Sequence, residues 1–269
     1  MMLIFDSFWR AALYCFHPRV IALSLLPLFL LTLFGLGLGY FFWESAVHAV
    51  WTWISGAGFF SAVLDIFSRF GMGNLRTAIA PFIVIVLATP VLIFLVMLVV
   101  AFMMMPALVS LVAARRFADL QCRASGSFWR SLLWTFSSVT MAGALLLLSM
   151  PFWLILPLLF FLPPLIWGWL NYRVMSFDAL VQHATSDERH AVMRAHRWAL
   201  LGMGVATGYL GAMPSLIWAA GAMATVFALV LLPLVLWLYT FIFAFSSLWF
   251  THYCLAALQE HRTHDITYS

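Results

Sequence analysis

The sequence predicts an all-α, polytopic helical membrane protein with a single membrane domain over residues 1–269. The composition is 65% apolar and only 8% charged, whereas soluble domains carry about 25% charged residues. Long uncharged runs cover 20–43, 77–114, 131–172 and 198–259, and a helix needs only ~20 apolar residues to cross a bilayer. The runs lack the alternating pattern of an outer-membrane barrel. We therefore expect two long transmembrane helices, two helical hairpins broken by proline and glycine, and interfacial amphipathic helices.

The first element, 4–19, is expected to be an amphipathic helix lying in the membrane interface. Its apolar residues recur at helical spacing, while Asp6 and Arg10 fall on the other face. Because these charges also make it a poor signal peptide, we expect it to be retained. His17-Pro18-Arg19 should interrupt this helix, and 20–43 should form the first span.

Residues 44–76 combine an apolar stripe rich in tryptophan with scattered charges, which is typical of interfacial helices. We place this segment on the periplasmic side. Residues 77–114 exceed one upright span, so they predict a long tilted helix that bends near Pro90 or Pro106.

Residues 131–172 and 198–259 should each form a hairpin. A straight helix over 131–172 would be ~63 Å long, about twice the thickness of the hydrocarbon core. Its length permits either two short full spans or two half-penetrating helices. The residues that we expect to break helices are Pro18, Pro27, Pro151, Pro157, Pro163, Pro164, Gly202, Gly204 and Pro214.

Between the hairpins, 173–197 concentrates charge and should be a cytoplasmic amphipathic segment. Thr185 and Glu188 have capping-box spacing, and we expect Arg194 and Arg197 in the last helical turn, where they complement the helix dipole. Arginine is densest in 115–130 and 173–197. The positive-inside rule therefore predicts that both termini are cytoplasmic, including a polar tail at 260–269. We expect the protein in a bacterial inner membrane.

The chain offers no convergent catalytic set, so we expect no enzyme, no cofactor and no metal. There is no P-loop or G-x-S-x-G motif, and Cys15, Cys122 and Cys254 form no C-x-x-C pair. Glycines at 35–39 and at 202–208 indicate close helix packing rather than a nucleotide loop. His183, His190 and His196 miss the i, i+4 spacing of helical metal ligands.

Broken membrane helices expose backbone N–H groups that attract anions, and paired breaks often mark transport sites. Only His252 places an ionisable group near a span, which favours channel-like passage of a small anion without intramembrane proton coupling. Arg10, Arg19 and Arg173 are the candidate substrate-binding residues at the cytoplasmic mouth. The alternative is a non-transporting scaffold or interaction protein whose cytoplasmic segment docks a partner.

Three stretches of the sequence carry a resemblance to a known family. They are FDSFWRAALYCFHPRVIALSLLPL, YRVMSFDALVQHA followed by a basic helix, and GMGVATGYLGAMP. The first resembles the amphipathic helix and proline-marked first span, and the other two resemble later segments, of the CysZ-type sulfate permease and etoposide-induced protein family of integral membrane proteins. The resemblance implies two long spans, two hairpins that penetrate only partly, a homo-oligomer, and uptake of sulfate for cysteine synthesis. The expected partners are thus the lipid bilayer, a small inorganic anion and further copies of the chain. We expect no nucleic acid as a partner.

Overall fold

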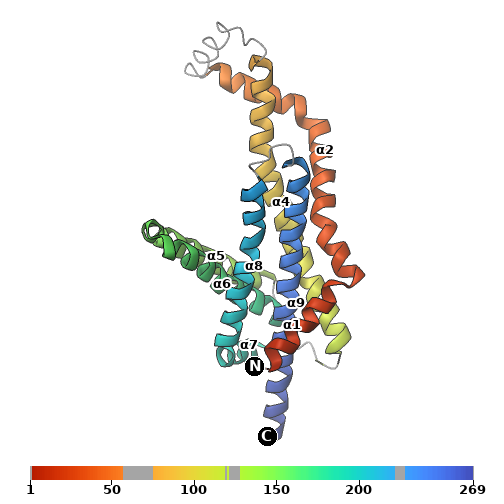
Figure 1. Cartoon of the computed structure of the whole chain (residues 1–269). Coiled ribbons are helices and arrows are strands. Elements are labelled where there is room, and N and C mark those ends of the chain that lie inside the picture. Colours follow the sequence, from red (N-terminus) through yellow and green to blue (C-terminus); the bar gives the residue numbers. More distant parts are fainter. Residues whose placement is uncertain (1, 57–74, 119, 121–127, 222–227, 269) are drawn as a thin grey trace. The chain divides into compact units, whose positions relative to one another are not determined.

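The computed structural model describes residues 2–56, 75–118, 120, 128–221 and 228–268, and these residues form helices and no strand. Figure 1 shows the helices in chain order. They are α1 (Met2–Cys15), α2 (Pro18–Gly56), α4 (Leu75–Arg116), α5 (Phe128–Ser149), the 3₁₀ helix η1 (Met150–Leu154), α6 (Leu156–Leu180), α7 (Ser186–Ala195), α8 (Arg197–Gly221) and α9 (Ala228–Tyr268). The expected all-α fold class is confirmed.

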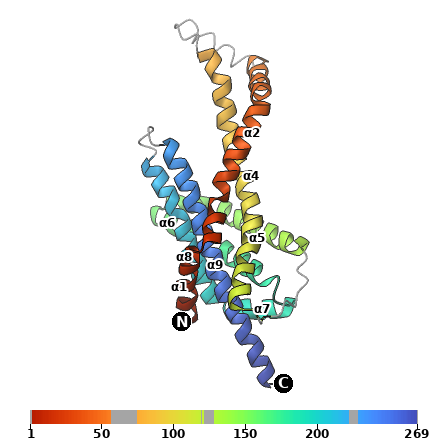
Figure 2. The same ribbon diagram turned by 90° about the vertical axis from the view of Figure 1, so that its right-hand side faces the viewer.

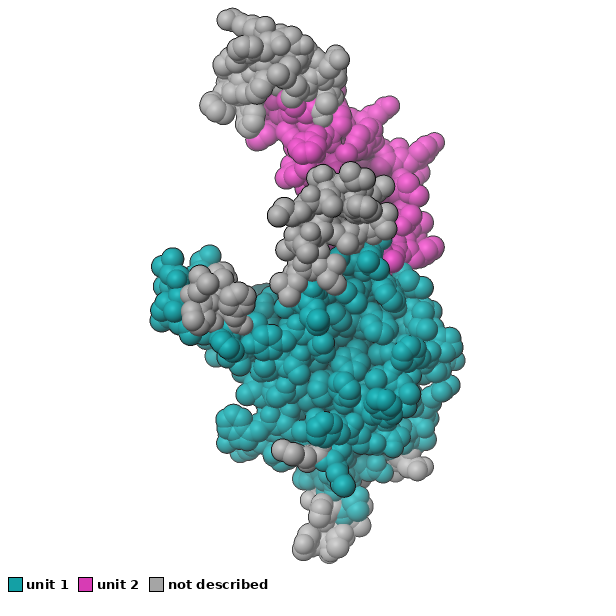
Figure 3. All heavy atoms as spheres, in the orientation of Figure 1, with its two compact units in different colours: residues 1–25, 102–269 teal, residues 26–101 magenta. Residues whose placement is uncertain are grey.

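The chain divides into two compact units, coloured separately in Figure 3. Unit 1 comprises residues 1–25 and 102–269, and unit 2 comprises residues 26–101. The helices α2 and α4 each contribute to both units, since α2 passes residue 26 and α4 passes residue 101.

Helix α9 forms the centre of unit 1. It packs against α1, α6, α7 and α8, and Figures 1 and 2 both show α8 running beside it. Every residue from Ser246 to Leu258 is buried. Trp237 extends these contacts to the start of α2, because its indole N–H donates to Ser24 Oγ at 3.2 Å. Burial on all sides explains why this helix is apolar around its whole circumference.

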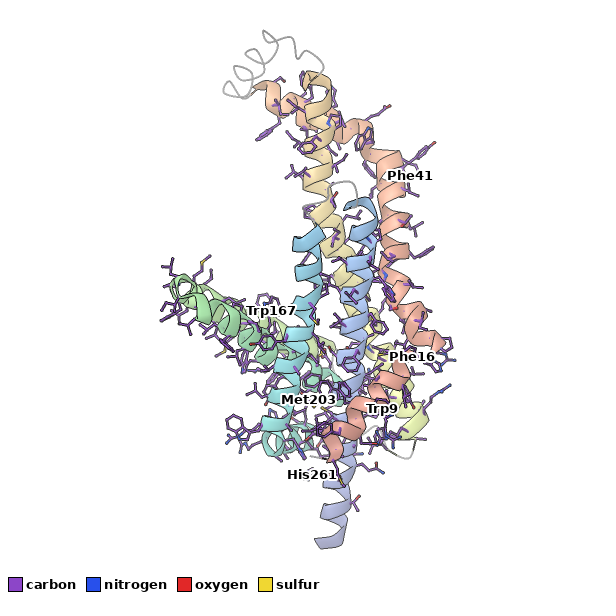
Figure 4. All side chains as sticks on the ribbon, in the orientation of Figure 1. Trp9, Phe16, Phe41, Trp167, Met203 and His261 are labelled. Carbon is purple, nitrogen blue, oxygen red and sulfur yellow. The ribbon has the colours of Figure 1, made fainter. Side chains whose placement is uncertain are left out.

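Helix α1 lies against α9 through one narrow face. Ser7, Ala11 and Cys15 are its buried residues, and their spacing of four places them on one side of the helix. Trp9 and Phe16 remain 66% and 76% exposed, and both are labelled in Figure 4. The sequence therefore folds α1 as an amphipathic helix whose aromatic face is left uncovered by the described chain.

The closest helix packing in unit 1 joins α6 and α8 through glycine. A Cβ at Gly204 would lie 2.2 Å from the carbonyl oxygen of Gly168, and one at Gly208 would lie 2.9 Å from that of Pro164. The two backbones approach this closely because Gly168, Gly204 and Gly208 carry no side chain. This confirms the packing role predicted for the glycines of 202–208, although a Cβ at Gly202 would meet nothing within 4 Å.

Unit 2 consists of the later part of α2 and the earlier part of α4. Gly35 faces Leu92 across these helices, because a Cβ at Gly35 would lie 3.7 Å from Leu92 Cδ2, whereas Gly37 and Gly39 face open space. Large apolar side chains project outward, including Tyr40 at 85% and Phe41 at 76% exposure. Such a surface suits a lipid environment, where apolar side chains meet hydrocarbon instead of water.

Four helices of the described chain are long and apolar enough to cross a membrane. By length and composition they contain Pro18–Gly56, Ile79–Val96, Leu133–Phe152 and Pro233–Thr263. Over half of the most apolar stretch of the last is buried within the protein, against less than a fifth for the others. Together with the apolar composition, these helices are those of a multi-pass membrane protein.

Several expected boundaries differ from the structure. Helix α2 continues through Glu44 to Gly56, because a single charge at an exposed position does not end a helix. Of the expected interfacial segment, residues 57–74 lie outside the described residues. Helix α6 continues beyond residue 172 to Leu180, and α9 includes the expected tail as far as Tyr268.

The expected helix breaks also divide into two groups. Pro18, Pro151 and Pro157 lie at helix boundaries. The other positions lie inside continuous helices, which corrects the expectation for Pro27, Pro163, Pro164, Gly202, Gly204 and Pro214. In membrane helices, packing and neighbouring groups compensate for the hydrogen bond that proline removes.

Candidate functional site: a basic cluster at the helix ends

The ends of α1 and α4 meet at a shared carboxylate. Asp6 Oδ1 accepts a hydrogen bond from Arg10 Nε at 2.8 Å, and Asp6 Oδ2 accepts one from Arg116 Nη2 at 2.9 Å. The hydrogen bond from Arg10, together with that from Arg116, holds the pKa of Asp6 below its usual value. Asp6 is therefore ionised at neutral pH and fixes the last turn of α4 to the first helix.

Two further arginines adjoin this pairing at the junction of α1 and α2. His17 Nδ1 accepts the backbone N–H of Arg19 at 3.2 Å, which caps the start of α2. Desolvation and the charges of Arg115 and Arg19 lower the pKa of His17, so both guanidinium groups lie near its ring. We define Asp6, Arg10, Arg19, Arg115 and Arg116 as the basic end cluster.

A buried histidine lies behind the cluster. His252 of α9 is fully buried, and its Nδ1 lies 3.3 Å from Arg116 Nη1. Because a guanidinium only donates hydrogen bonds, Nδ1 accepts, and the ring proton belongs on Nε2. Within the described residues, Nε2 has no hydrogen-bond partner. Tyr14 packs edge-on against the ring, with centroids 4.8 Å apart.

The basic end cluster carries four guanidinium groups and one carboxylate. Arg10, Arg19 and Arg115 are exposed, and Arg116 is partly exposed. One carboxylate cannot neutralise four cations, so the cluster retains a positive field that attracts anions. Guanidinium groups also match oxyanions in geometry. Chemically, the arrangement can concentrate and bind a small oxyanion at this end of unit 1.

Arg173 occupies a different environment, among aromatic rings. Its guanidinium carbon lies 4.5 Å from the ring centroid of Trp134 and 5.1 Å from that of Trp169. Trp134 stacks on Phe177 at 5.0 Å, and Arg189 lies over Phe177 at 4.3 Å. We call these five side chains the aromatic stack. It joins α5, α6 and α7.

A second ionic contact fixes α7 to the end of α9. The predicted capping box is confirmed, because Thr185 Oγ1 accepts from the Glu188 N–H and a Glu188 carboxylate oxygen accepts from the Thr185 N–H. Arg262 donates to Glu188 through Nε at 2.9 Å and to the carbonyl of His183 at 2.7 Å. The Arg262 hydrogen bond lowers the pKa of Glu188 to about 2. Arg194 lies in the last turn of α7 as predicted, whereas Arg197 begins α8.

The predicted substrate-binding residues thus fall in two places. Arg10 and Arg19 belong to the basic end cluster, whereas no hydrogen bond or ion pair of the described chain links Arg173 to it. We expected backbone N–H groups at helix starts to be available to an anion. At the start of α2, however, the Arg19 N–H already donates to His17 Nδ1. At the start of α6, Ile155 provides no side-chain cap.

Sequence reasoning missed Arg115, Arg116 and His252 as site residues. Asp6 and Arg116 are 110 positions apart, so no local pattern could pair them. A usable signal was present at Arg115-Arg116, because a double arginine ends the uncharged run 77–114. The i, i+4 spacing of Trp169, Arg173 and Phe177 could likewise have indicated the aromatic stack.

Comparison with known protein families gives a match over most of the chain. The family model described as Sulfate transporter CysZ/Etoposide-induced protein 2.4 matches residues 7–221. No protein among the curated ones matches, and no solved structure matches. The matched range contains Arg10, Arg19, Arg115, Arg116 and Arg173 but ends before His252.

Proposed function

Because the chain belongs to the Sulfate transporter CysZ/Etoposide-induced protein 2.4 family, we propose that it carries a small inorganic anion, with sulfate as the candidate, across a bacterial inner membrane. Passage is channel-like. Arg10, Arg19 and Arg173 draw the anion to the cytoplasmic side, where both chain termini also lie. The functional unit is a homo-oligomer.

The charge excess of the basic end cluster is the observation that carries this proposal. Arg10 and Arg116 share the carboxylate of Asp6, while Arg19 and Arg115 are exposed. A field of this sign raises the local concentration of a divalent oxyanion more than that of a monovalent one, because the attraction scales with the ligand's charge. Sulfate therefore fits the cluster better than chloride.

The proposal includes no proton coupling within the membrane. Coupled pumps usually place carboxylates or histidine chains inside their spans. In the four candidate spans of the described chain, the carboxylates Glu44 and Glu260 are exposed, and the buried histidine is His252, whose Nδ1 faces the cation Arg116. In this proposal His252 anchors Arg116, because its Nδ1 accepts a hydrogen bond from that guanidinium.

Radiolabelled sulfate uptake into liposomes tests the proposal. Protein-containing vesicles should take up sulfate faster than empty ones. Arg19→Gln should reduce the initial rate roughly tenfold at low ionic strength, because one steering charge is lost. The difference should shrink at about 0.5 M or more of an inert salt, since the screening length is then only a few ångströms.

Arg194→Gln is the matched control. Arg194 is exposed at the end of α7, so its removal subtracts the same charge from a different surface. Equal losses of rate in Arg19→Gln and Arg194→Gln would assign the effect to net charge and remove the basic end cluster from the proposal. No flux above empty vesicles would remove transport itself.

The scaffold alternative meets an observation that weighs against it. Arg189, Val192 and Met193 of α7 are buried, and Arg262 fixes the helix through Glu188. A segment packed in this way offers a partner only its outer face. Deleting 185–197 would also remove Glu188, to which Arg262 donates, so point changes on the exposed face of α7 are the better test for docking.

A further inference from the structure

We propose that the edge of the Arg173 guanidinium, which lies over the rings of Trp134 and Trp169, is a binding site for a tetrahedral oxyanion, separate from the basic end cluster. The inference develops the role of Arg173 and rests on the proposed function only in its choice of sulfate as one ligand. The same tetrahedral chemistry is offered by the phosphate of a phospholipid headgroup.

The sequence spacing of α6 builds the site. Trp169, Arg173 and Phe177 follow at intervals of four, so they share one face of the helix. Trp134 reaches this face from α5, and its indole Nε1–H donates to the backbone carbonyl of Arg173 at 3.2 Å. That hydrogen bond fixes the indole against the helix turn that carries the guanidinium.

Further stacking limits the motion of Trp134. Its ring lies on Phe177 with an interplanar angle of 14° and a centroid distance of 5.0 Å. Arg189, which is 4% exposed, covers Phe177 at 4.3 Å. Because three helices contribute to this arrangement, the position of Arg173 is set before any ligand arrives, which lowers the entropic cost of binding.

The contacts of Arg173 leave its hydrogen-bond donors unused. Cation–π contacts engage the guanidinium charge through the ring faces of Trp134 and Trp169. Among the described residues, the side chain of Arg173 has neither an ion pair nor a hydrogen-bond acceptor. The N–H groups of a guanidinium point outward in its plane and match two oxygens of a tetrahedral oxyanion.

A second arginine strengthens the positive field at this position. Burial raises the pKa of the Tyr172 hydroxyl, and the charges of Arg173 and Arg197 both act against that rise, so a second cation contributes to the field around this part of α6. Arg197 also lies over the ring of Trp198 at 5.0 Å, and Trp198 is 72% exposed. Exposed tryptophan beside arginine is typical of the headgroup region of a membrane, which is where both a lipid phosphate and a free anion are present.

Two binding measurements on the purified full chain in an uncharged detergent distinguish the two sources. One is equilibrium dialysis with radiolabelled sulfate. The other is native mass spectrometry with added phosphatidylglycerol, using diacylglycerol of the same acyl chains as the control without phosphate. Arg173→Gln should weaken the affinity for sulfate or phosphatidylglycerol, whichever the wild type binds, about tenfold. This is the effect expected for loss of a charge-assisted pair of hydrogen bonds.

Arg194→Gln should bind as the wild type does, since it removes the same charge from exposed α7. Unchanged sulfate and lipid binding in folded Arg173→Gln would overturn the proposal, as would an absence of both in the wild type. If Arg173→Gln does not fold, Arg173→Lys takes its place. Lysine retains the charge but lacks the planar fork, so it should weaken binding, and unchanged binding would overturn the site.

Failure of this inference is distinguishable from failure of the proposed function. A wild type without sulfate flux, but with binding that depends on Arg173, would remove transport and keep the site. Flux that persists in Arg173→Gln together with lost lipid binding would assign Arg173 to the membrane lipid instead of the transported anion.

Discussion

Single ionic contacts hold distant parts of unit 1 together at the residue scale. Arg262 joins the end of α9 to α7 through Glu188, and Arg116 joins α4 to α1 through Asp6. The two pairs differ in burial. The side chains of Arg262 and Glu188 are 12% and 14% exposed, whereas that of Asp6 is 43% exposed. We therefore expect the Arg262–Glu188 pair to contribute more stability, because solvent screens it less.

Replacing Arg262 by Gln should lower the free energy of unfolding by about 1.5–3 kcal/mol, the range for hydrogen bonds to charged groups. The substitution removes the guanidinium that donates two hydrogen bonds to the carboxylate of Glu188. Thermal unfolding in detergent, followed by circular dichroism, measures the change. Arg194→Gln should remain within about 0.5 kcal/mol of the wild type, as exposed substitutions do. Similar losses in both variants would contradict the assignment.

The same pair predicts an acid-dependent loss of stability. The pKa of Glu188 is lowered from 4.5 to about 2, so folding favours its ionised form. This contribution is fully present above pH 4.5 and is lost as the pH falls from 4.5 through about 2. Comparing the melting temperatures of the wild type and Glu188→Gln across this range tests it. The difference between the two proteins should narrow as the solution becomes more acidic, and a constant difference would exclude Glu188 as its source.

Glycine contacts decide the geometry at the element scale. The helices α6 and α8 approach until Gly204 touches the carbonyl of Gly168. Backbone contact of this kind replaces the hydrophobic driving force that is absent between helices in lipid. This contact attaches the α5–α6 hairpin to α8, which packs against α9.

Substituting Gly204 by Ala should destabilise the protein by about 1–3 kcal/mol, the usual cost of overpacking. The new Cβ would lie 2.2 Å from the Gly168 oxygen, so the helices would have to separate. Gly202→Ala is the matched control, because its Cβ would meet nothing within 4 Å, and alanine favours a helix by up to ~1 kcal/mol. Thermal unfolding should show a lower melting temperature for Gly204→Ala and no decrease for Gly202→Ala. A stable Gly204→Ala would contradict the close contact.

Local sequence patterns could predict some elements and not others. The capping box at Thr185 and the helix boundary at Pro18 depend only on neighbouring residues, so both could be predicted from the sequence. The predicted end of the first span before Glu44 was wrong, because α2 continues to Gly56. A lipid-facing helix and an interfacial helix have similar amino-acid compositions, so composition does not mark a boundary between them. The prediction that proline breaks α6 and α8 internally was wrong, because both helices continue through Pro163, Pro164 and Pro214. For the candidate site, Arg10 and Arg19 could be proposed from their position in the sequence, whereas Arg116 and His252 required the tertiary contact between α1, α4 and α9.

The orientation of the whole molecule in its membrane is a separate prediction. Ser186 is exposed at the start of α7, so Ser186→Cys in a Cys122→Ser background reports the side on which α7 lies. Cys15 and Cys254 are buried, and burial raises the pKa of the Cys15 thiol to about 11, so both should react slowly. A membrane-impermeant maleimide should label inside-out vesicles and spare right-side-out ones. The reverse pattern would place α7 on the opposite side from the one proposed.

The central claim is that this chain passes sulfate through a membrane without using protons. Initial sulfate uptake into liposomes, with the pH equal on both sides or set to differ by about one unit, tests it most directly. We predict uptake that exceeds that of empty vesicles, saturates with sulfate and does not respond to the imposed pH difference. Uptake equal to that of empty vesicles would contradict transport, and uptake that follows the pH difference would contradict the uncoupled mechanism.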